Sequence, residues 1–212
     1  MSIGQKGAQT LYHAFDLAQW LGLPLNTHVT INFANTKCCP SMAVKAFARL
    51  RRDYHGKWCS RHPNLRHAAT GVHAFENSRE EEAFVTMGEG DDHNVHVHWA
   101  VHVPPQLAME FEHELTRWVE IVTGGPCDEF TIKITHRPQN IVRAYLLKGI
   151  QTMWAETYKA IAQPQGLIVG GRRTGTTSNL SRTNRIEADR TRGIRRRIPA
   201  RPRPMPAVHA AV

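Results

Sequence analysis

One short segment of this 212-residue chain, from Asn94 to Pro104, restricts its fold more than any other. Polar and apolar residues alternate along it, which predicts a strand with one buried face. His96 and His98 then project to one side. The other side carries the apolar residues Val95, Val97, Trp99 and Val101. Side chains two apart on a strand are separated by roughly 6.6 Å, at about 3.3 Å per residue, so both imidazoles can reach one divalent ion. Because the chain has 13 histidines, a metal-free polar face is the simpler interpretation of this pair taken alone.

A carboxylate is expected beside the two histidines. Residues 83–89 and 95–103 predict two strands joined by a tight turn, which form an antiparallel hairpin. In that hairpin Glu89 falls opposite His96, and directly opposed residues project to the same face. Glu76 is the less favoured alternative as third ligand. One carboxylate and two neutral imidazoles suit a divalent ion that keeps open positions for substrate oxygens, as a Lewis-acid role requires.

A second reactive pair lies on a predicted helix that Asn140 can cap. Tyr145 and Lys148 are three positions apart, which places the phenol and the ammonium on one helix face. A tyrosine oxygen becomes a useful nucleophile when a phosphate is held before it and a cation shields the developing charge. On this spacing alone, a core tyrosine with a lysine extending to solvent is the simpler interpretation. Tyr158, outside any such pair, is a reserve candidate.

Together these motifs resemble the HUH endonuclease superfamily, which is named for its His-hydrophobic-His strand. The resemblance covers residues 28 to about 150. It comprises a first strand over residues 28–33, an upstream acidic residue, the histidine pair and a helical YxxK motif. This order is similar to that of rolling-circle replication initiators of plasmids and phages and of single-strand transposases. Relaxases place the tyrosine before the histidines.

The resemblance implies a DNA-nicking and rejoining enzyme. Tyr145 would attack a phosphate in single-stranded or hairpin DNA, form a 5′-phosphotyrosyl link and release a 3′-hydroxyl. Glu89, His96 and His98 would hold Mg²⁺ or Mn²⁺, and Lys148 would help to position the phosphate. The chain has no GxxxxGK[ST] phosphate loop, so unwinding is expected to need a host helicase.

The order of predicted elements indicates an α+β fold with a mainly antiparallel central sheet and flanking helices. We expect an accessory N-terminal helix within residues 1–26, a catalytic domain over 27–165 and a flexible Arg/Pro-rich tail over 166–212. The predicted helices cover residues 11–21 (capped by Thr10), 41–54, 105–123 and 140–150, with an irregular connection over 55–68 and a weak strand over 71–75.

The net charge of +9 is concentrated in the tail. From Arg172 onward there are 11 arginines against Glu187 and Asp189, while residues 1–171 carry 16 basic and 16 acidic side chains. A segment with so few large apolar residues is expected to stay unfolded, and either to bind nucleic-acid phosphates or to solubilise the chain. The candidate nucleic-acid contacts are Arg172, Arg173, Arg182, Arg185, Arg195, Arg196 and Arg197.

Two other functions stay open. A non-catalytic nucleic-acid-binding protein would use the basic tail and need no metal, whereas a metal-dependent phosphoester hydrolase would use water and need no Tyr145. The four cysteines include the adjacent Cys38 and Cys39, and no signal peptide or long apolar run accompanies them. This pattern favours a reduced, cytoplasmic protein without a membrane partner.

Overall fold

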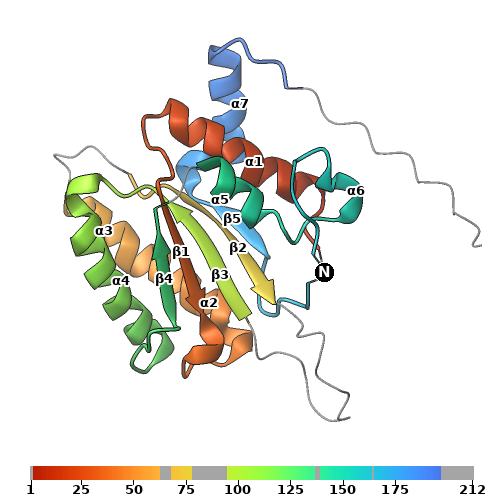
Figure 1. Ribbon diagram of the computed structural model, residues 1–212. Helices are drawn as coiled ribbons and strands as arrows, with labels where there is room; N and C mark the ends of the chain where they lie inside the picture. Colours follow the sequence, from red (N-terminus) through yellow and green to blue (C-terminus); the bar gives the residue numbers. More distant parts are fainter. Residues whose placement is uncertain (1, 63–67, 78–94, 137–138, 164, 197–212) are drawn as a thin grey trace, which may run out of the picture.

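A five-stranded antiparallel sheet forms the centre of the protein, with its strands in the order β4-β1-β3-β2-β5 (Figure 1). The computed structural model describes residues 2–62, 68–77, 95–136, 139–163 and 165–196. The strands are β1 (Thr27–Asn32), β2 (Gly71–Asn77), β3 (Val95–Val101), β4 (Ile132–Thr135) and β5 (Thr174–Thr176).

Helices cover both faces of this sheet (Figure 1). In chain order they are α1 (Gln5–Trp20), α2 (Ala43–Arg49), α3 (Gly56–Ser60), α4 (Ala108–Thr123), α5 (Gln139–Leu146), α6 (Thr152–Ala155) and α7 (Arg182–Thr191). One apolar core joins α2, α3 and α4 to one face, and a second joins α1 and α5 to the other. The predicted α+β class with an antiparallel sheet is confirmed.

The division of β3 into an apolar face and a histidine face is as predicted, but the expectation of one buried face is wrong, because His98 and Ala100 are buried as well. Val97, Trp99 and Val101 are fully buried in the core with α2, α3 and α4, while His98 faces α5. The helix predicted over residues 105–123 is also found. α4 follows a 3-10 turn over Pro105–Leu107 and ends at Gly124, whose left-handed φ of 77° closes it. Local periodicity and glycine placement were therefore sufficient signals for these two elements.

The predicted partner of β3 is wrong. β3 pairs with β1 on one side and with β2 on the other, so the expected hairpin with residues 83–89 is replaced by a β2–β3 pair. Residues 78–94, including the predicted strand, turn and Glu89, lie outside the described residues. β2, which the sequence indicated weakly over 71–75, is buried along its whole length.

α1 begins at Gln5, before the predicted cap at Thr10. Thr10 lies within the helix, and its hydroxyl accepts a hydrogen bond from Arg185 at 3.3 Å. The apolar residues of α1 are buried against the sheet and α5, so this helix belongs to the core rather than to an accessory segment. The buried set includes Ala8, Leu11, Phe15 and Ala18.

The second helical stretch is longer than predicted. α2 continues through a π-type turn over Leu50–His55 into α3, which ends at Ser60. The irregular connection predicted from residue 55 is therefore wrong for its first part. The extension buries Trp58 and Cys59 in the core with α4, which explains why the helix does not stop earlier.

The chain from 166 to 196 is folded, which corrects the prediction of a flexible tail beginning at residue 166. β5 pairs with β2, and α7 packs on α1. Ser181 caps α7, because its hydroxyl accepts a hydrogen bond from the backbone N–H of Asn184. Residues 197–212 lie outside the described residues.

Two arginines hold the α7 region against α1. Arg185 is 7% exposed and donates to the backbone oxygens of Gln9 and Thr10 at 3.3 and 3.2 Å. Arg196 donates to the carboxylate of Asp16 at 3.0 Å. Burial on its own would raise the pKa of Asp16, but hydrogen bonds from His13 and Arg196 lower it to about 2. The basic charge of this segment is thus partly used in internal contacts.

In the described part of the chain, no helix combines the length and apolar character needed to cross a bilayer. The four cysteines are free thiols. Burial raises the pKa of Cys59 to about 12 and that of Cys127 to about 11, which keeps both protonated at neutral pH.

Arg185→Met should destabilise the fold, because it keeps an apolar side chain but removes the hydrogen bonds that the buried guanidinium donates to Gln9 and Thr10. We expect a loss of about 1–3 kcal/mol in the free energy of unfolding, measured by urea denaturation. Arg182→Met, at an exposed position of the same helix, should stay within roughly 0.5 kcal/mol of wild type. Equal effects of the two substitutions would contradict the assignment of α7 to the folded domain.

Candidate active site

Polar residues of three neighbouring strands lie together on one face of the sheet. In the register of the strands, Thr30 of β1 lies beside His98, while Asn32 and Glu76 flank His96 on either side. Side chains directly opposed across antiparallel strands project to the same face. The histidine pair therefore lies between polar residues of β1 and an acidic residue of β2.

The carboxylate of Glu76 is the centre of this group. Glu76 is 6% exposed, and its Oε2 lies 2.7 Å from His98 Nε2 and 2.7 Å from Lys148 Nζ. Burial on its own would raise the pKa of Glu76, but hydrogen bonds from His98 and Lys148 lower it to about 2. Glu76 is therefore ionised at neutral pH, and its charge is balanced by Lys148.

Tyr145 and Lys148 come together as predicted. Tyr145 is in the last turn of α5. Lys148 follows in a tight turn, where its backbone N–H donates to the Tyr145 carbonyl. Lys148 Nζ donates to the phenol oxygen at 3.1 Å, and Tyr145 is 38% exposed. Burial would lower the pKa of Lys148, but hydrogen bonds to Glu76 and Tyr145 raise it, so the ammonium stays charged.

α5 brings this pair onto the histidine face of the sheet. The ring of Tyr145 lies edge-on to that of His98, with centroids 4.7 Å apart, and 5.4 Å from the ring of His28. The apolar side of the helix, Val142 and Leu146, is buried against α1 and the sheet. Packing of the helix thus fixes the direction of the tyrosine.

Both histidines of the pair favour the neutral state. Burial lowers the pKa of His98 and of His96, and the nearby Glu76 offsets this in part. A neutral imidazole has one N–H, so if His98 Nε2 donates to Glu76, its Nδ1 accepts from the Thr30 hydroxyl at 3.0 Å. Neutral imidazoles are the form that coordinates metal ions.

The donor atoms fit a divalent ion in kind. Two neutral imidazoles and one ionised carboxylate are suitable ligands for such an ion. Among the described residues, no three His, Cys, Asp or Glu side chains are arranged as a formed metal site. Glu76 and His98 are hydrogen-bonded to each other instead, so an ion would replace this bond.

Of the two candidate acidic ligands, Glu76 lies at the site. Glu89, the favoured one, is outside the described residues. Tyr158 is away from the site, since it is buried beside Tyr12 in the core between α1 and the sheet. His28 and Thr30 were not assigned a role from sequence, although their alternation on a strand predicted for the same sheet was a usable signal.

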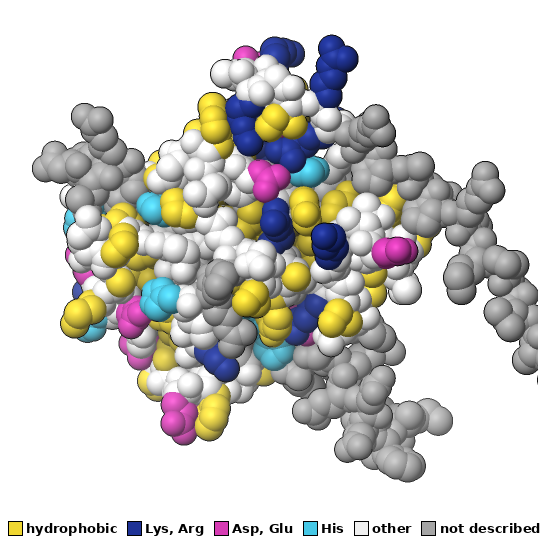
Figure 2. All heavy atoms as spheres, turned by 45° about the horizontal axis from the view of Figure 1, so that its top comes forward, with side chains coloured by type: hydrophobic (Ala, Val, Ile, Leu, Met, Phe, Trp, Pro, Cys, Tyr) yellow, Lys and Arg dark blue, Asp and Glu magenta, His cyan; other side chains and the backbone are white. Residues whose placement is uncertain are grey.

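The predicted nucleic-acid-binding arginines separate into two groups. Figure 2 shows Lys and Arg side chains gathered at the end of the molecule where Figure 1 places α7. Some of the predicted residues are exposed and others are held by internal hydrogen bonds. The exposed ones are Arg172, Arg182 and Arg195; the internally bonded ones are Arg173, Arg185 and Arg196; Arg197 lies outside the described residues.

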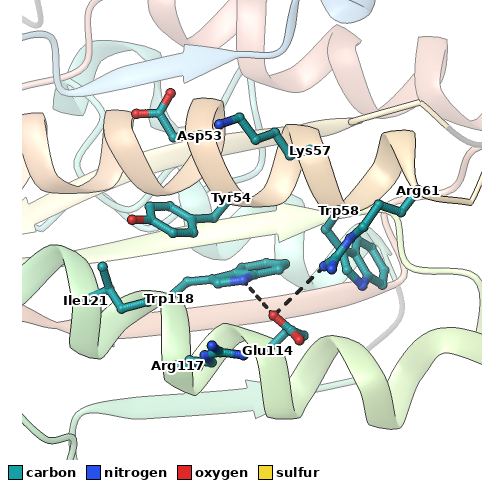
Figure 3. A pocket seen from close by; sticks show the side chains of 9 residues that line it. All are labelled: Asp53, Tyr54, Lys57, Trp58, Arg61, Glu114, Arg117, Trp118 and Ile121. Atoms are coloured by element: carbon teal, nitrogen blue, oxygen red, sulfur yellow. Dashed lines mark hydrogen bonds and ion pairs between the residues drawn. The ribbon is translucent and has the colours of Figure 1, made fainter.

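A separate hollow of about 410 Å³ lies between α3 and α4, on the other side of the sheet (Figure 3). Trp118 and Tyr54 line it, and the Glu114 carboxylate accepts from Trp118 Nε1 at 3.0 Å and lies 4.0 Å from Arg61. None of the predicted site residues lines this hollow. The chemistry predicted from the sequence therefore belongs to the group around Glu76.

The low pKa of Glu76 predicts a pH-dependent contribution to stability. The folded pKa of about 2 is below the ordinary value of 4.5, so the contribution is present above the ordinary value and is lost as pH falls toward the folded one. The excess stability of wild type over Glu76→Gln should shrink by on the order of 3 kcal/mol from about pH 5 to about pH 2. Urea denaturation in metal-free buffer measures this difference, with the exposed Glu187→Gln as control. A pH-independent difference would contradict the charge assignment.

Comparison of the chain with protein-family models, with curated proteins and with solved structures finds no match in any of the three. The interpretation of the site therefore depends on its own geometry: an exposed phenol, a charged amine, an ionised carboxylate and two neutral imidazoles on one face of the sheet.

Proposed function

We propose that this protein nicks and rejoins single-stranded DNA through a covalent link to Tyr145, in the manner of the HUH endonucleases that it resembles. One observation supports this most strongly. The Tyr145 hydroxyl accepts from Lys148 Nζ at 3.1 Å, and the same ammonium lies 2.7 Å from Glu76, next to the histidine pair. Tyr145 and Glu76, which are 69 positions apart in sequence, are thus connected through Lys148.

The reaction is an exchange of phosphate esters. Tyr145 Oη forms a bond to phosphorus, and the bond between phosphorus and the 3′-oxygen of the preceding nucleotide breaks. The phenol proton leaves to solvent, to which Tyr145 is exposed, and the released oxygen takes a proton to become a 3′-hydroxyl. Attack by a 3′-hydroxyl on the phosphotyrosyl group reverses these steps and rejoins DNA.

Lys148 supplies electrostatic stabilisation rather than base catalysis. Its raised pKa keeps it charged, so it cannot accept the phenol proton. A fixed positive charge beside the phenol oxygen stabilises the negative charge that develops there in the transition state. Glu76 holds the ammonium in this position.

Glu76, His96 and His98 would hold Mg²⁺ or Mn²⁺, which when bound polarises a phosphate oxygen as a Lewis acid. The burial of Glu76 supports a functional role, because buried ion pairs add little net stability to a fold. Carboxylates with strongly shifted pKa values are also concentrated at functional sites. The exposure of Tyr145 likewise differs from the buried tyrosine expected of a merely amphipathic helix.

The substrate is single-stranded or hairpin DNA of a plasmid, phage or other mobile element in the cytoplasm, with replication initiation or transposition as the process. A host helicase would supply unwinding. The exposed arginines around α7 provide the phosphate contacts, since their side chains have no buried structural role.

Tyr145→Phe should abolish covalent attachment to DNA and leave DNA binding largely intact. The test incubates the protein with labelled single-stranded DNA containing origin-like hairpins, with Mn²⁺ or EDTA, and examines adducts on a denaturing gel. Tyr158→Phe is the matched control, because this tyrosine is buried away from the site, and it should form the adduct at the wild-type level.

The other functions give different results in the same assay. Metal-dependent cleavage without an adduct, unchanged in Tyr145→Phe, would identify a phosphoester hydrolase that uses water. Binding without cleavage or adduct, in a pool that contains the native target, would identify a non-catalytic nucleic-acid-binding protein.

Arg182→Gln combined with Arg195→Gln should weaken DNA binding and its salt dependence. On single-stranded DNA each phosphate contact contributes about 0.7 to the slope of log K against log salt concentration, so the slope should decrease by roughly 1 to 1.5. Fluorescence anisotropy at several salt concentrations measures it. The control is Arg52→Gln with Arg117→Gln, an equal charge loss at exposed positions on the α3 and α4 side. Equal slopes for the two double variants would show that the α7 region has no special role.

A further inference from the structure

The segment that follows Pro164 contacts the end of β2 that carries Glu76. The backbone N–H of Gly166 donates to the Asn77 carbonyl at 2.7 Å, and the Asn77 side chain donates to the Leu167 carbonyl at 3.0 Å. A Cβ atom on Gly166 would lie 2.9 Å from Asn77 Nδ2, so a larger residue here would displace the Asn77 side chain from this contact. Gln165 is thereby placed beside Glu76.

The hydrogen bonds of Gln165 determine the orientation of its carboxamide. Its Oε1 accepts from the backbone N–H of Asn77 at 3.2 Å and from Arg173 Nη1 at 3.3 Å. Both partners are obligatory donors, so the oxygen must face them. The Nε2 end then points to Glu76 and donates to Oε1 at 3.4 Å.

Arg173 is fixed in turn by the backbone. Its guanidinium donates to the Phe75 carbonyl at 2.9 Å and to the Gly166 carbonyl. The side chain is therefore an internal anchor, although the sequence indicated it as a DNA contact. Gln165 is also packed against the chain beside Lys148, because a Cβ atom on Gly149 would lie 3.2 Å from Gln165 Cγ.

The two oxygens of Glu76 have separate partners: Oε2 meets His98 and Lys148, and Oε1 meets Gln165. We propose that Gln165 is a positioning residue for the reaction. Held by Arg173, it fixes the rotation of the Glu76 carboxylate and thereby keeps Lys148 against Tyr145. This inference rests on the proposed nicking activity. It means that the reaction needs a residue C-terminal to the YxxK motif as well as the motif itself.

Gln165→Met tests this inference, because it removes the hydrogen bonds and nearly keeps the side-chain volume. We expect adduct formation at saturating DNA to slow by at least about tenfold, and Mn²⁺ affinity measured by calorimetry without DNA to fall by a similar factor, as for other residues that orient metal ligands. The Kd for DNA should not change. Gln163→Met, at an exposed position in the same segment, is the matched control and should equal wild type in all three measurements.

Wild-type adduct rate and Mn²⁺ affinity in Gln165→Met would overturn the inference. A slower rate explained by unfolding at the assay temperature, seen by circular dichroism, would also overturn it, since Gln165 would then be merely structural.

A metal-free and DNA-free measurement separates this inference from the proposed function. The side-chain amide signals of Gln165 and Gln163 are assigned in ¹⁵N NMR spectra by their loss in the two Met variants. Glu76→Gln should shift the Gln165 signal and leave the Gln163 signal in place. If wild type forms no adduct, the proposed function fails, and an unshifted Gln165 signal independently refutes the Gln165–Glu76 contact.

Discussion

The candidate site depends on one buried negative charge. Glu76 is removed from water on β2, and an isolated carboxylate in that position would be strongly destabilising. It stays ionised because His98 and Lys148 direct hydrogen-bond donors at it, and Gln165 donates a third hydrogen bond. These partners come from β3, from the turn after α5 and from the segment before β5. A single charge therefore makes three distant parts of the chain depend on one another.

This arrangement has an energetic cost as well as a use. Replacing a buried ion pair by apolar side chains is often neutral or stabilising, so stability alone gives little reason to keep Glu76 and Lys148. What the pair does provide is a fixed ammonium 3.1 Å from an exposed phenol oxygen. Positioning charge before a reaction begins avoids reorganisation during it, which is how an enzyme benefits from such a group.

The parts that could be predicted from sequence are those with a local signal. The alternation around His96 and His98 has the period of a strand, and the spacing of Tyr145 and Lys148 has that of a helical turn. The identity of the acidic residue could not be derived in this way, because β3 pairs with β2, beyond a 17-residue intervening segment, and not with the strand predicted over residues 83–89. α7 was missed because a buried arginine, Arg185, attaches it to α1, and hydrophobic periodicity does not detect charged side chains that are buried by hydrogen bonding.

The two outermost strands of the sheet are its shortest. β4 has 4 residues and β5 has 3, whereas the strands between them have 6 or 7. A short edge strand presents few unpaired backbone groups to another chain, which protects against edge-to-edge aggregation of sheets. β5 covers part of β2, an otherwise open strand that includes Val72, Ala74 and Phe75. Loss of the chain from β5 onward would expose that strand as a template for self-association, so the C-terminal segment also contributes to the solubility of the folded protein.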